Sequence, residues 1–293
     1  MSEFTRRFAN NPEKLGLARI IPDVVFTQRP GADLKLQLIV PQTVDEDVAR
    51  AKRCPAIVFV QGSGWTSPNV WYEIPQLSQL AQRGFVIATI THRSTKDGHV
   101  APAFLEDVKT AIRFLRAHAD RFYVDPDRIG IWGTSSGGNA ALLAALTMDS
   151  GAYQTHEYAD QSDHVSVCVD TFGPADIFQQ FGEVDAVMSE MYARQMIGNY
   201  SESFSLDDLK FMSPVHLVKE GMDLPPFLIM HGTGDLVVGY QQSVSMHEKL
   251  LTSGYESDLV TVDDAVHEGD FWSQDLLNHV FDYLEAKLGG IKE

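Results

Sequence analysis

The segment Gly133-Thr134-Ser135-Ser136-Gly137 places serine between two glycines, at a spacing that suits a nucleophile. An apolar run at residues 129–132 precedes it, and small residues suited to the start of a helix follow it. On a cramped strand-to-helix turn, flanking glycines avoid side-chain collisions, and the serine hydroxyl rises above the edge of the sheet. Similar Gly and Ser patterns also form structural turns, so the position between a strand and a helix is what favours chemistry. We predict that the nucleophile is Ser135, at the central position, rather than Ser136.

A nucleophilic serine needs a base that accepts its proton, and the sequence offers ten histidines. Most of them lie too early in the chain, within helical patterns or inside a long insertion. His267 differs, because it follows the apolar run 259–262 in a loop just before a helical segment. A loop histidine at that point can reach Ser135, and we predict that His267 is the base.

The base in turn needs a carboxylate that orients its imidazole ring. An apolar run leads into the glycine-punctuated loop 231–235, which places Asp235 just beyond the carboxyl end of a strand. We predict that Asp235 is the acid, with Asp263 and Asp264 as alternatives that lie closer to the base in sequence. His231 precedes the acid, so we expect it to support this loop.

Acyl transfer also needs hydrogen-bond donors aimed at the negative oxygen that develops on the reacting carbonyl. The apolar run 56–60 leads into Gln61-Gly62-Ser63-Gly64-Trp65, where small residues let backbone N–H groups face such an oxygen. We assign this oxyanion hole to the N–H group of Ser63 or Gly64, together with that of Ser136. Trp65 has two interpretations that the sequence leaves open, one in an acyl pocket and one in the core.

Short β-branched runs alternate with helical periodicity along most of the chain, and this alternation must position the residues above. Several runs are continuously apolar, which is typical of parallel strands buried on both faces. The pattern predicts an α/β fold with a mostly parallel central sheet, helices on both faces and an antiparallel N-terminal hairpin. The expected strands cover residues 23–26, 34–40, 56–60, 86–90, 129–132, 165–169, 227–230 and 259–262. Amphipathic helices are expected at 101–118 and 271–288.

A long insertion interrupts this alternation at about residues 177–223, within a single expected domain over 1–293. Met188 and Tyr192 belong to an apolar stripe at helical spacing in this insertion, whose surroundings are predominantly acidic. The stripe fits packing against the main domain, and it also fits a helical cap that walls a substrate pocket. Both interpretations can hold together.

The composition narrows the class of protein. The 293 residues include 40 acidic and 23 basic ones, for a formal charge of −17. This balance argues against nucleic-acid binding, which needs a basic surface, and against docking on anionic membranes. No secretory signal pattern is found at the N-terminus, and no apolar run approaches the roughly 20 residues of a membrane-spanning helix. We therefore expect a soluble cytoplasmic protein.

Two smaller features complete this picture. Cys54 and Cys168 each lie in an apolar run, so we expect buried thiols rather than a disulfide, and no C-x-x-C metal pair is present. Residues 1–20 have two interpretations, an arm that packs on a partner subunit and a frayed terminus.

Four motifs in this order resemble those of the α/β-hydrolase esterase/lipase group: Gln61–Trp65, Gly133–Gly137, His231–Asp235 and the loop at His267. Within that group, the chain is most similar to bacterial carboxylesterases that resemble bifunctional feruloyl/acetyl-xylan esterases. The turns at 125–128 and 172–176 also look like that group, and the resemblance covers roughly residues 50–290. The chain departs from the pattern at Gln61, where the group usually has histidine, and at Ser63, where it usually has glycine.

The resemblance implies an α/β-hydrolase fold and a serine carboxylic-ester hydrolase without a metal or other cofactor. We expect small esters with short-chain or aromatic, hydroxycinnamoyl-like acyl groups, in a pocket lined by Trp65, Met188 and Tyr192. The expected partner is this small-molecule ester, with no nucleic acid and no membrane insertion, and a homodimer is left open. Other interpretations of the same fold are a serine peptidase of the prolyl oligopeptidase type, an arylformamidase and a non-catalytic small-molecule receptor.

Overall fold

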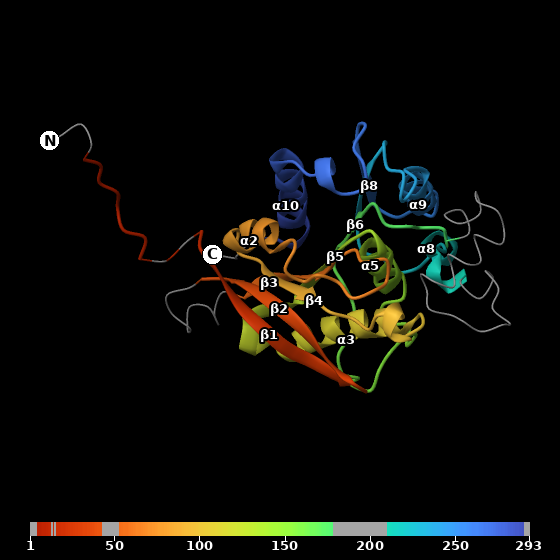
Figure 1. Cartoon of the computed structure of the whole chain (residues 1–293), viewed down its shortest axis with the longest axis horizontal. Coiled ribbons are helices and arrows are strands. Elements are labelled where there is room, and N and C mark those ends of the chain that lie inside the picture. Colours follow the sequence, from red (N-terminus) through yellow and green to blue (C-terminus); the bar gives the residue numbers. More distant parts are fainter. Residues whose placement is uncertain (1–4, 13, 15, 43–52, 178–209, 290–293) are drawn as a thin grey trace.

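The computed structural model describes residues 5–12, 14, 16–42, 53–177 and 210–289. Within these residues, one eight-stranded sheet forms the centre of the molecule, and helices lie on both of its faces (Figure 1). Its strand order is β1-β2-β4-β3-β5-β6-β7-β8. The strands are β1 (Ala18–Arg29), β2 (Ala32–Pro41), β3 (Cys54–Val60), β4 (Val86–Ile90), β5 (Val124–Thr134), β6 (Cys168–Thr171), β7 (Phe227–Gly232) and β8 (Ser257–Val262).

The direction of the strands brings the predicted site residues to one edge. β1 pairs with β2, and β2 with β4, in antiparallel fashion, whereas every pairing from β4 through β3 to β8 is parallel. The carboxyl ends of β3, β5, β7 and β8 therefore meet along the same edge of the sheet, which is where α/β folds place their sites. The N-terminal hairpin, the mostly parallel order and the predicted fold class are confirmed.

The sheet separates two apolar cores. Along β3, Ala56 and Val58 pack on the side that holds α3 and α5, whereas Ile57 and Phe59 pack on the side that holds α2 and α10. This two-sided burial explains why several strands are continuously apolar. The helices are α2 (Ile74–Gln82), α3 (Ala103–Ala117), α4 (Ala119–Phe122), α5 (Ser136–Leu146), α8 (Pro214–Leu217), α9 (Gln241–Thr252) and α10 (Gln274–Leu288), with 3₁₀ turns η1 (Thr95–Asp97) and η3 (Gly269–Phe271).

Most of the observed strands extend a few residues beyond the predicted ranges, and two elements differ for reasons that the structure shows. The strand expected at 165–169 lies at Cys168–Thr171. Its last residues, Asp170 and Thr171, are fully buried although they are polar, so the apolar pattern did not include them. The helix expected at 271–288 begins at Gln274, since the hydroxyl of Ser273 accepts the N–H group of Leu276 at 3.1 Å and caps the helix.

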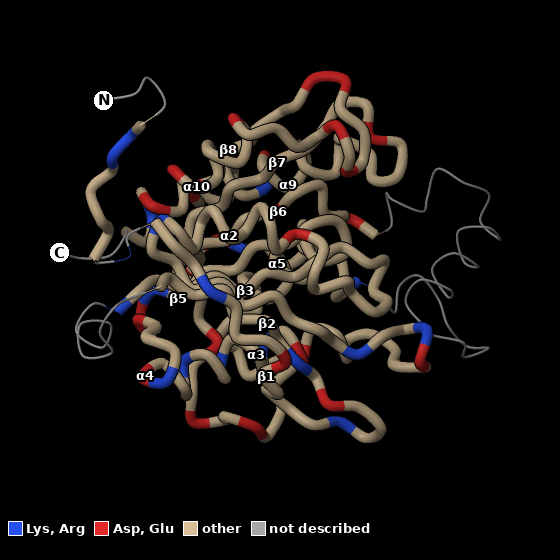
Figure 2. The backbone as a smooth tube through the Cα atoms, turned by 60° about the vertical axis from the view of Figure 1, so that its left-hand side comes forward, with Lys and Arg blue, Asp and Glu red and all other residues tan. Residues whose placement is uncertain are grey.

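The remaining predictions about the structure concern the expected cap, the two cysteines, membrane-spanning helices and the surface charge. Residues 178–209, most of the expected cap, lie outside the described residues. Cys54 and Cys168 are buried thiols on β3 and β6, as the sequence predicts. No helix in the described part of the chain is long and apolar enough to cross a membrane. Figure 2 shows acidic residues spaced along the loops around β7, β8 and α9.

Candidate active site

Ser135 lies at the turn where the chain passes from β5 directly into α5. Its backbone is in the positive-φ region, at φ 52° and ψ −124°, and its N–H group donates to the carbonyl of Thr171 at 2.9 Å. A Cβ on Gly133 would lie 2.0 Å from the carbonyl oxygen of Gly137, and a Cβ on Gly137 would lie 1.9 Å from that of Val60. Close backbone approach therefore requires both glycines of the motif, and the turn holds the serine in a strained conformation.

His267 joins the predicted nucleophile to the predicted acid from the loop that follows β8. Its Nε2 lies 3.0 Å from Oγ of Ser135, and its Nδ1 lies 2.6 Å from Oδ2 of Asp235. A carboxylate only accepts hydrogen bonds, so Nδ1 carries the hydrogen and Nε2 is left to accept the serine hydroxyl. The alternative acids, Asp263 and Asp264, are exposed, and neither takes the place of Asp235 beside the ring. The structure thus brings the three residues singled out in the sequence into one hydrogen-bonded chain.

Asp235 is buried, with 6% of its surface exposed, yet both of its carboxylate oxygens are hydrogen-bonded. Oδ1 accepts the backbone N–H groups of Val237 at 2.8 Å and Val238 at 2.9 Å. Oδ2 accepts from His267 and also lies 3.1 Å from Nε2 of His231. Burial by itself raises the pKa of Asp235, but these hydrogen bonds outweigh burial and hold the pKa well below its ordinary value. Asp235 therefore remains a carboxylate at neutral pH.

Aromatic rings pack behind the imidazole of His267. The ring of Phe172, just after β6, has its centroid 4.6 Å from that of His267 and 6.4 Å from that of His231. Phe271 packs edge-on against Phe172 at 5.1 Å, and Trp272 packs against Phe271 at 5.0 Å. This apolar wall restricts the positions of the imidazole ring and shields one side of it from water. No sequence pattern predicts this wall, because Phe172 lies about a hundred residues before Phe271 and Trp272.

The loop after β3 passes the nucleophile, and two of its N–H groups already have partners. Gly62 donates to Oγ1 of Thr134 at 2.9 Å, and Ser63 donates to Oγ of Ser136 at 2.9 Å. Of the two loop donors that the sequence left open, the N–H group of Ser63 is therefore engaged by a side chain. Among the described residues, no acceptor binds the N–H group of Gly64, and that of Ser136 lies in the first turn of α5 without an intrahelical partner.

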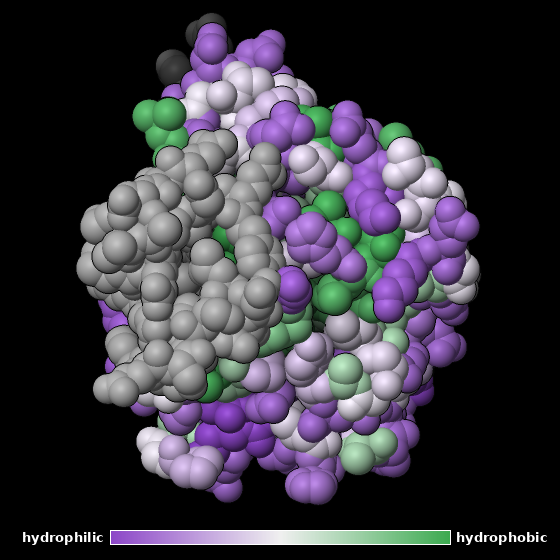
Figure 3. Space-filling view, turned by 90° about the vertical axis from the view of Figure 1, so that its right-hand side faces the viewer, coloured by the Kyte–Doolittle hydropathy of each residue, from purple (hydrophilic) through white to green (hydrophobic). Residues whose placement is uncertain are grey.

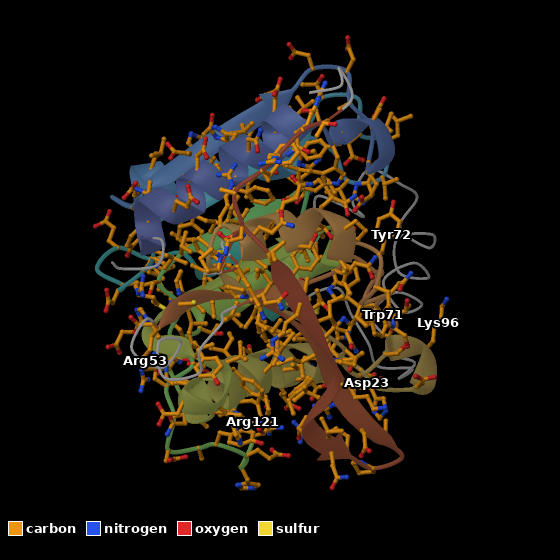
Figure 4. All side chains as sticks on the ribbon, turned by 90° about the vertical axis from the view of Figure 1, so that its left-hand side faces the viewer. Asp23, Arg53, Trp71, Tyr72, Lys96 and Arg121 are labelled. Carbon is orange, nitrogen blue, oxygen red and sulfur yellow. The ribbon has the colours of Figure 1, made fainter. Side chains whose placement is uncertain are left out.

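The residues predicted to line a substrate pocket have different outcomes. Trp65 is only 2% exposed and packs within the core on the α3 and α5 side, so the structure favours its core-packing interpretation. Met188 and Tyr192 lie outside the described residues. Trp71 and Tyr72, which the sequence analysis did not single out, are 50% and 56% exposed in the segment before α2. Figure 4 labels both of them on the outside of the molecule.

Two carboxyl groups beside the site were also missed by sequence reasoning. Burial, and then repulsion from Glu268, raise the pKa of Glu73 to about 8. Burial also raises the pKa of Glu268, which directly follows His267. The side chain of Gln61, at the start of the oxyanion loop, hydrogen-bonds Glu73. Glu73 thus interacts both with the loop 61–65, through Gln61, and with Glu268 on the loop that carries His267.

The chain is similar to a known family and to known esterases. A family model described as BD-FAE matches residues 45–250. The esterase LipC of Mycobacterium tuberculosis is 30% identical over 204 residues, which make up 68% of this chain and 49% of LipC. The isoprenylcysteine alpha-carbonyl methylesterase ICME of Arabidopsis thaliana is 27% identical over 232 residues, 76% of this chain and 52% of ICME. The chain thus spans about half the length of these curated relatives.

Solved structures are similar over nearly the whole chain. A truncated form of a carbohydrate esterase from gut microbiota is 27% identical, with a TM-score of 0.77 over 95% of this chain and 99% of that one. Esterase 2 of Thermogutta terrifontis, with butyrate bound, is 26% identical, with a TM-score of 0.76 over 96% of this chain and 97% of that one. Both agree with the fold described above.

Proposed function

This chain belongs to the BD-FAE family and has the α/β-hydrolase fold, and from this premise we propose that it is a serine carboxylic-ester hydrolase. The observation that supports the proposal most directly is the chain of hydrogen bonds from Ser135 through His267 to Asp235, at 3.0 and 2.6 Å. In this proposal Ser135 is the nucleophile, His267 the base and Asp235 the acid. The esterase names of the relatives support the same activity.

The geometry suits acyl transfer in two steps. Nε2 of His267 accepts the proton of Ser135 as Oγ attacks the ester carbonyl, while Asp235 stabilises the imidazolium that forms. The N–H groups of Gly64 and Ser136 hold the oxyanion, helped by the positive end of the α5 dipole. His267 then gives its proton to the departing alcohol, which leaves an acyl-enzyme. Water then gives a proton to His267 as it attacks the acyl carbonyl, the bond between the acyl group and Oγ of Ser135 breaks, the carboxylic acid leaves, and His267 returns the proton to Ser135.

For the substrate, we propose a small ester with a short-chain or aromatic, hydroxycinnamoyl-like acyl group. Figure 3 shows apolar side chains exposed among hydrophilic ones on one face of the molecule, and Trp71 and Tyr72 add aromatic surface beyond β3. The acidic balance of the chain disfavours strongly anionic substrates. The butyrate bound to one of the structural relatives supports a short acyl chain.

Labelling with a fluorophosphonate tests whether the chain is a catalyst. We expect one phosphonyl group per wild-type chain, found by mass spectrometry on Ser135, and no label on the Ser135→Ala variant. Ser136→Ala serves as a matched control, because it removes the neighbouring hydroxyl and keeps the nucleophile. A folded wild-type protein that stays unlabelled would contradict the proposal and favour a non-catalytic receptor.

A panel of p-nitrophenyl acetate, butyrate and octanoate with methyl ferulate tests the substrate class. We expect the highest kcat/KM with acetate, butyrate or methyl ferulate. Octanoate as the best substrate would overturn this part of the proposal while leaving the esterase activity intact.

A further inference from the structure

His231 is a second histidine on the predicted acid, at the carboxyl end of β7. The side chain is fully buried, and its Nε2 lies 3.1 Å from Oδ2 of Asp235 and 2.9 Å from the carbonyl oxygen of Val238. Its Nδ1 lies 2.7 Å from the hydroxyl of Ser243, which is buried on α9. The proposed reaction makes no use of this histidine.

The partners of His231 decide where its hydrogen lies. Both partners of Nε2, a carboxylate and a backbone carbonyl, can only accept, so Nε2 carries the hydrogen. The hydroxyl of Ser243 can then donate to Nδ1 and hold the ring in this tautomer. A buried N–H group is therefore fixed towards the carboxylate of Asp235.

The oxygen that accepts this N–H group is the one that binds the proposed base. Oδ2 of Asp235 accepts from Nδ1 of His267 at 2.6 Å and faces Nε2 of His231 at 3.1 Å. Oδ1 is already held by two backbone N–H groups, of Val237 and Val238. The carboxylate is thus anchored without His231, and what His231 adds is a competing donor on Oδ2.

We propose that His231, held by Ser243, is a positioning residue that weakens the grip of Asp235 on the imidazolium form of His267. The inference rests on the proposed function, since it assigns His267 as the base. A carboxylate oxygen that shares its lone pairs with a second donor stabilises the imidazolium less. His231 therefore limits how strongly Asp235 holds the protonated ring of His267 during the reaction.

Few other titratable groups face this pair in the described part of the chain. Glu268 follows His267 on the same loop and interacts with it electrostatically. Tyr240, just before α9, packs its ring at a right angle to His231, with centroids 5.9 Å apart. From β6, the neighbour is the apolar ring of Phe172. Glu268 is unchanged by substitutions at His231, so a change in pH dependence reports the lost donor.

The test compares the pH profile of kcat/KM for p-nitrophenyl acetate in wild type, His231→Leu and His231→Gln. Without the donor, Oδ2 binds the imidazolium more strongly, so the acid limb moves to higher pH in His231→Leu. We expect a loss of about fivefold to tenfold at pH 6 and less than about twofold at pH 9. His231→Gln, whose amide can donate to Oδ2, returns the limb towards wild type. His247→Leu is the matched control. Nδ1 of His247 lies 2.9 Å from the hydroxyl of Ser257, and this pair does not contact the triad.

A second readout does not depend on turnover. The low-field proton resonance of Nδ1–H in His267 at acid pH moves further downfield in His231→Leu, because its bond to Asp235 strengthens. A loss of kcat/KM that is equal at every pH, with this resonance unmoved, would show a merely structural role and overturn the inference. If His231→Leu does not fold, Ser243→Ala supplies the measurement, with a smaller shift in the same direction. Failure of wild type to react with fluorophosphonate would instead contradict the proposed function.

Discussion

The two sides of the candidate site differ in how far their hydrogen bonds already suit the reaction. On the acid–base side, both oxygens of Asp235 are bonded, and His267 contacts Ser135 and Asp235 at once. The ring of Phe172 packs against the imidazole of His267. Each of these groups is already placed for its proposed role, so this side is preorganised.

On the oxyanion side, formed by the loop 61–65, two of the backbone donors are occupied by neighbouring hydroxyls, whereas that of Gly64 has no acceptor among the described residues. The N–H groups of Gly62 and Ser63 are bonded to the side chains of Thr134 and Ser136. Buried Oε1 of Gln61 and Nε1 of Trp65 lack partners within the described structure. The proton-transfer groups are therefore fixed before substrate arrives, whereas a loop donor such as the N–H group of Ser63 must exchange partners to contribute.

The largest effect is expected from breaking the acid–base side with Asp235→Asn. The amide donates a hydrogen where the carboxylate accepts one, so it favours the wrong tautomer of His267 and leaves no acceptor for the serine proton. We expect kcat for p-nitrophenyl acetate to fall about 10⁴-fold while the fold persists by circular dichroism. The exposed neighbour Asp263 provides the control, and a comparable loss in Asp263→Asn would mean that the wrong acid has been assigned.

Gly62→Ala disturbs the oxyanion side at its closest approach to the nucleophile. A Cβ at this position would lie 2.7 Å from Cβ of Ser135 and 2.8 Å from the carbonyl oxygen of Thr134, so the loop must move. Displaced donors should lower kcat about 100-fold, the cost typical of losing one oxyanion contact. Gly239→Ala, where an added Cβ meets nothing within 4 Å, should leave kcat unchanged. A wild-type kcat in Gly62→Ala would show that this loop contributes no oxyanion donor.

Ser136→Ala tests whether the hydroxyl of Ser136 limits kcat by occupying the N–H group of Ser63. The substitution frees the N–H group of Ser63, which then becomes available to the oxyanion, and we expect kcat to rise about threefold at unchanged KM. Ser63→Ala is the control, because it removes only a hydroxyl bonded to the carbonyl of Thr66 and keeps the N–H group. A fall in kcat in Ser136→Ala would mean instead that this hydroxyl itself donates to the oxyanion.

The same contrast describes what the sequence could predict. The meeting of Ser135, Asp235 and His267 follows from three apolar runs, because parallel strands bring their carboxyl ends to one edge. The position of the loop 61–65 follows in the same way, since Val60 at the end of β3 lies opposite Gly133 of β5. The mostly parallel direction of the strands could be predicted from patterns that recur along the chain, whereas the order of the strands in the sheet was not predicted.

Contacts that depend on side-chain direction could not be predicted in this way. The bond between Ser63 and Ser136 joins a backbone N–H group to one side-chain conformation, and no periodicity signals it. The proximity of Glu73 and Glu268 depends on how α2 packs beside α10, where Gln79 and Gln274 are hydrogen-bonded at 2.8 Å. The sequences of two helices that lie far apart in the chain do not show how these helices pack against each other.

This acidic pair links the two sides of the site, and the last prediction concerns its effect on stability rather than on kcat. Glu73 is 9% exposed and is hydrogen-bonded by Gln61 on the oxyanion side, while Glu268 follows the base. The folded protein binds a proton on Glu73 up to about pH 8, whereas an unfolded chain releases it near the ordinary value of 4.5. Between these values the folded state binds more protons, so stability falls as pH rises from about 4.5 to about 8.

Glu73→Gln removes this ionisation while keeping the size of the side chain. At pH 9 the variant should be more stable than wild type by on the order of 1–3 kcal/mol, because wild type must then hold a buried charge beside Glu268. At pH 5, where Glu73 is protonated in the folded state, the difference should largely vanish. Urea unfolding at both pH values measures this, with the exposed Glu248→Gln as control. An equal change at the two pH values would mean that Glu73 does not retain its proton, and the two sides of the site would then be joined by a charged group rather than a neutral one.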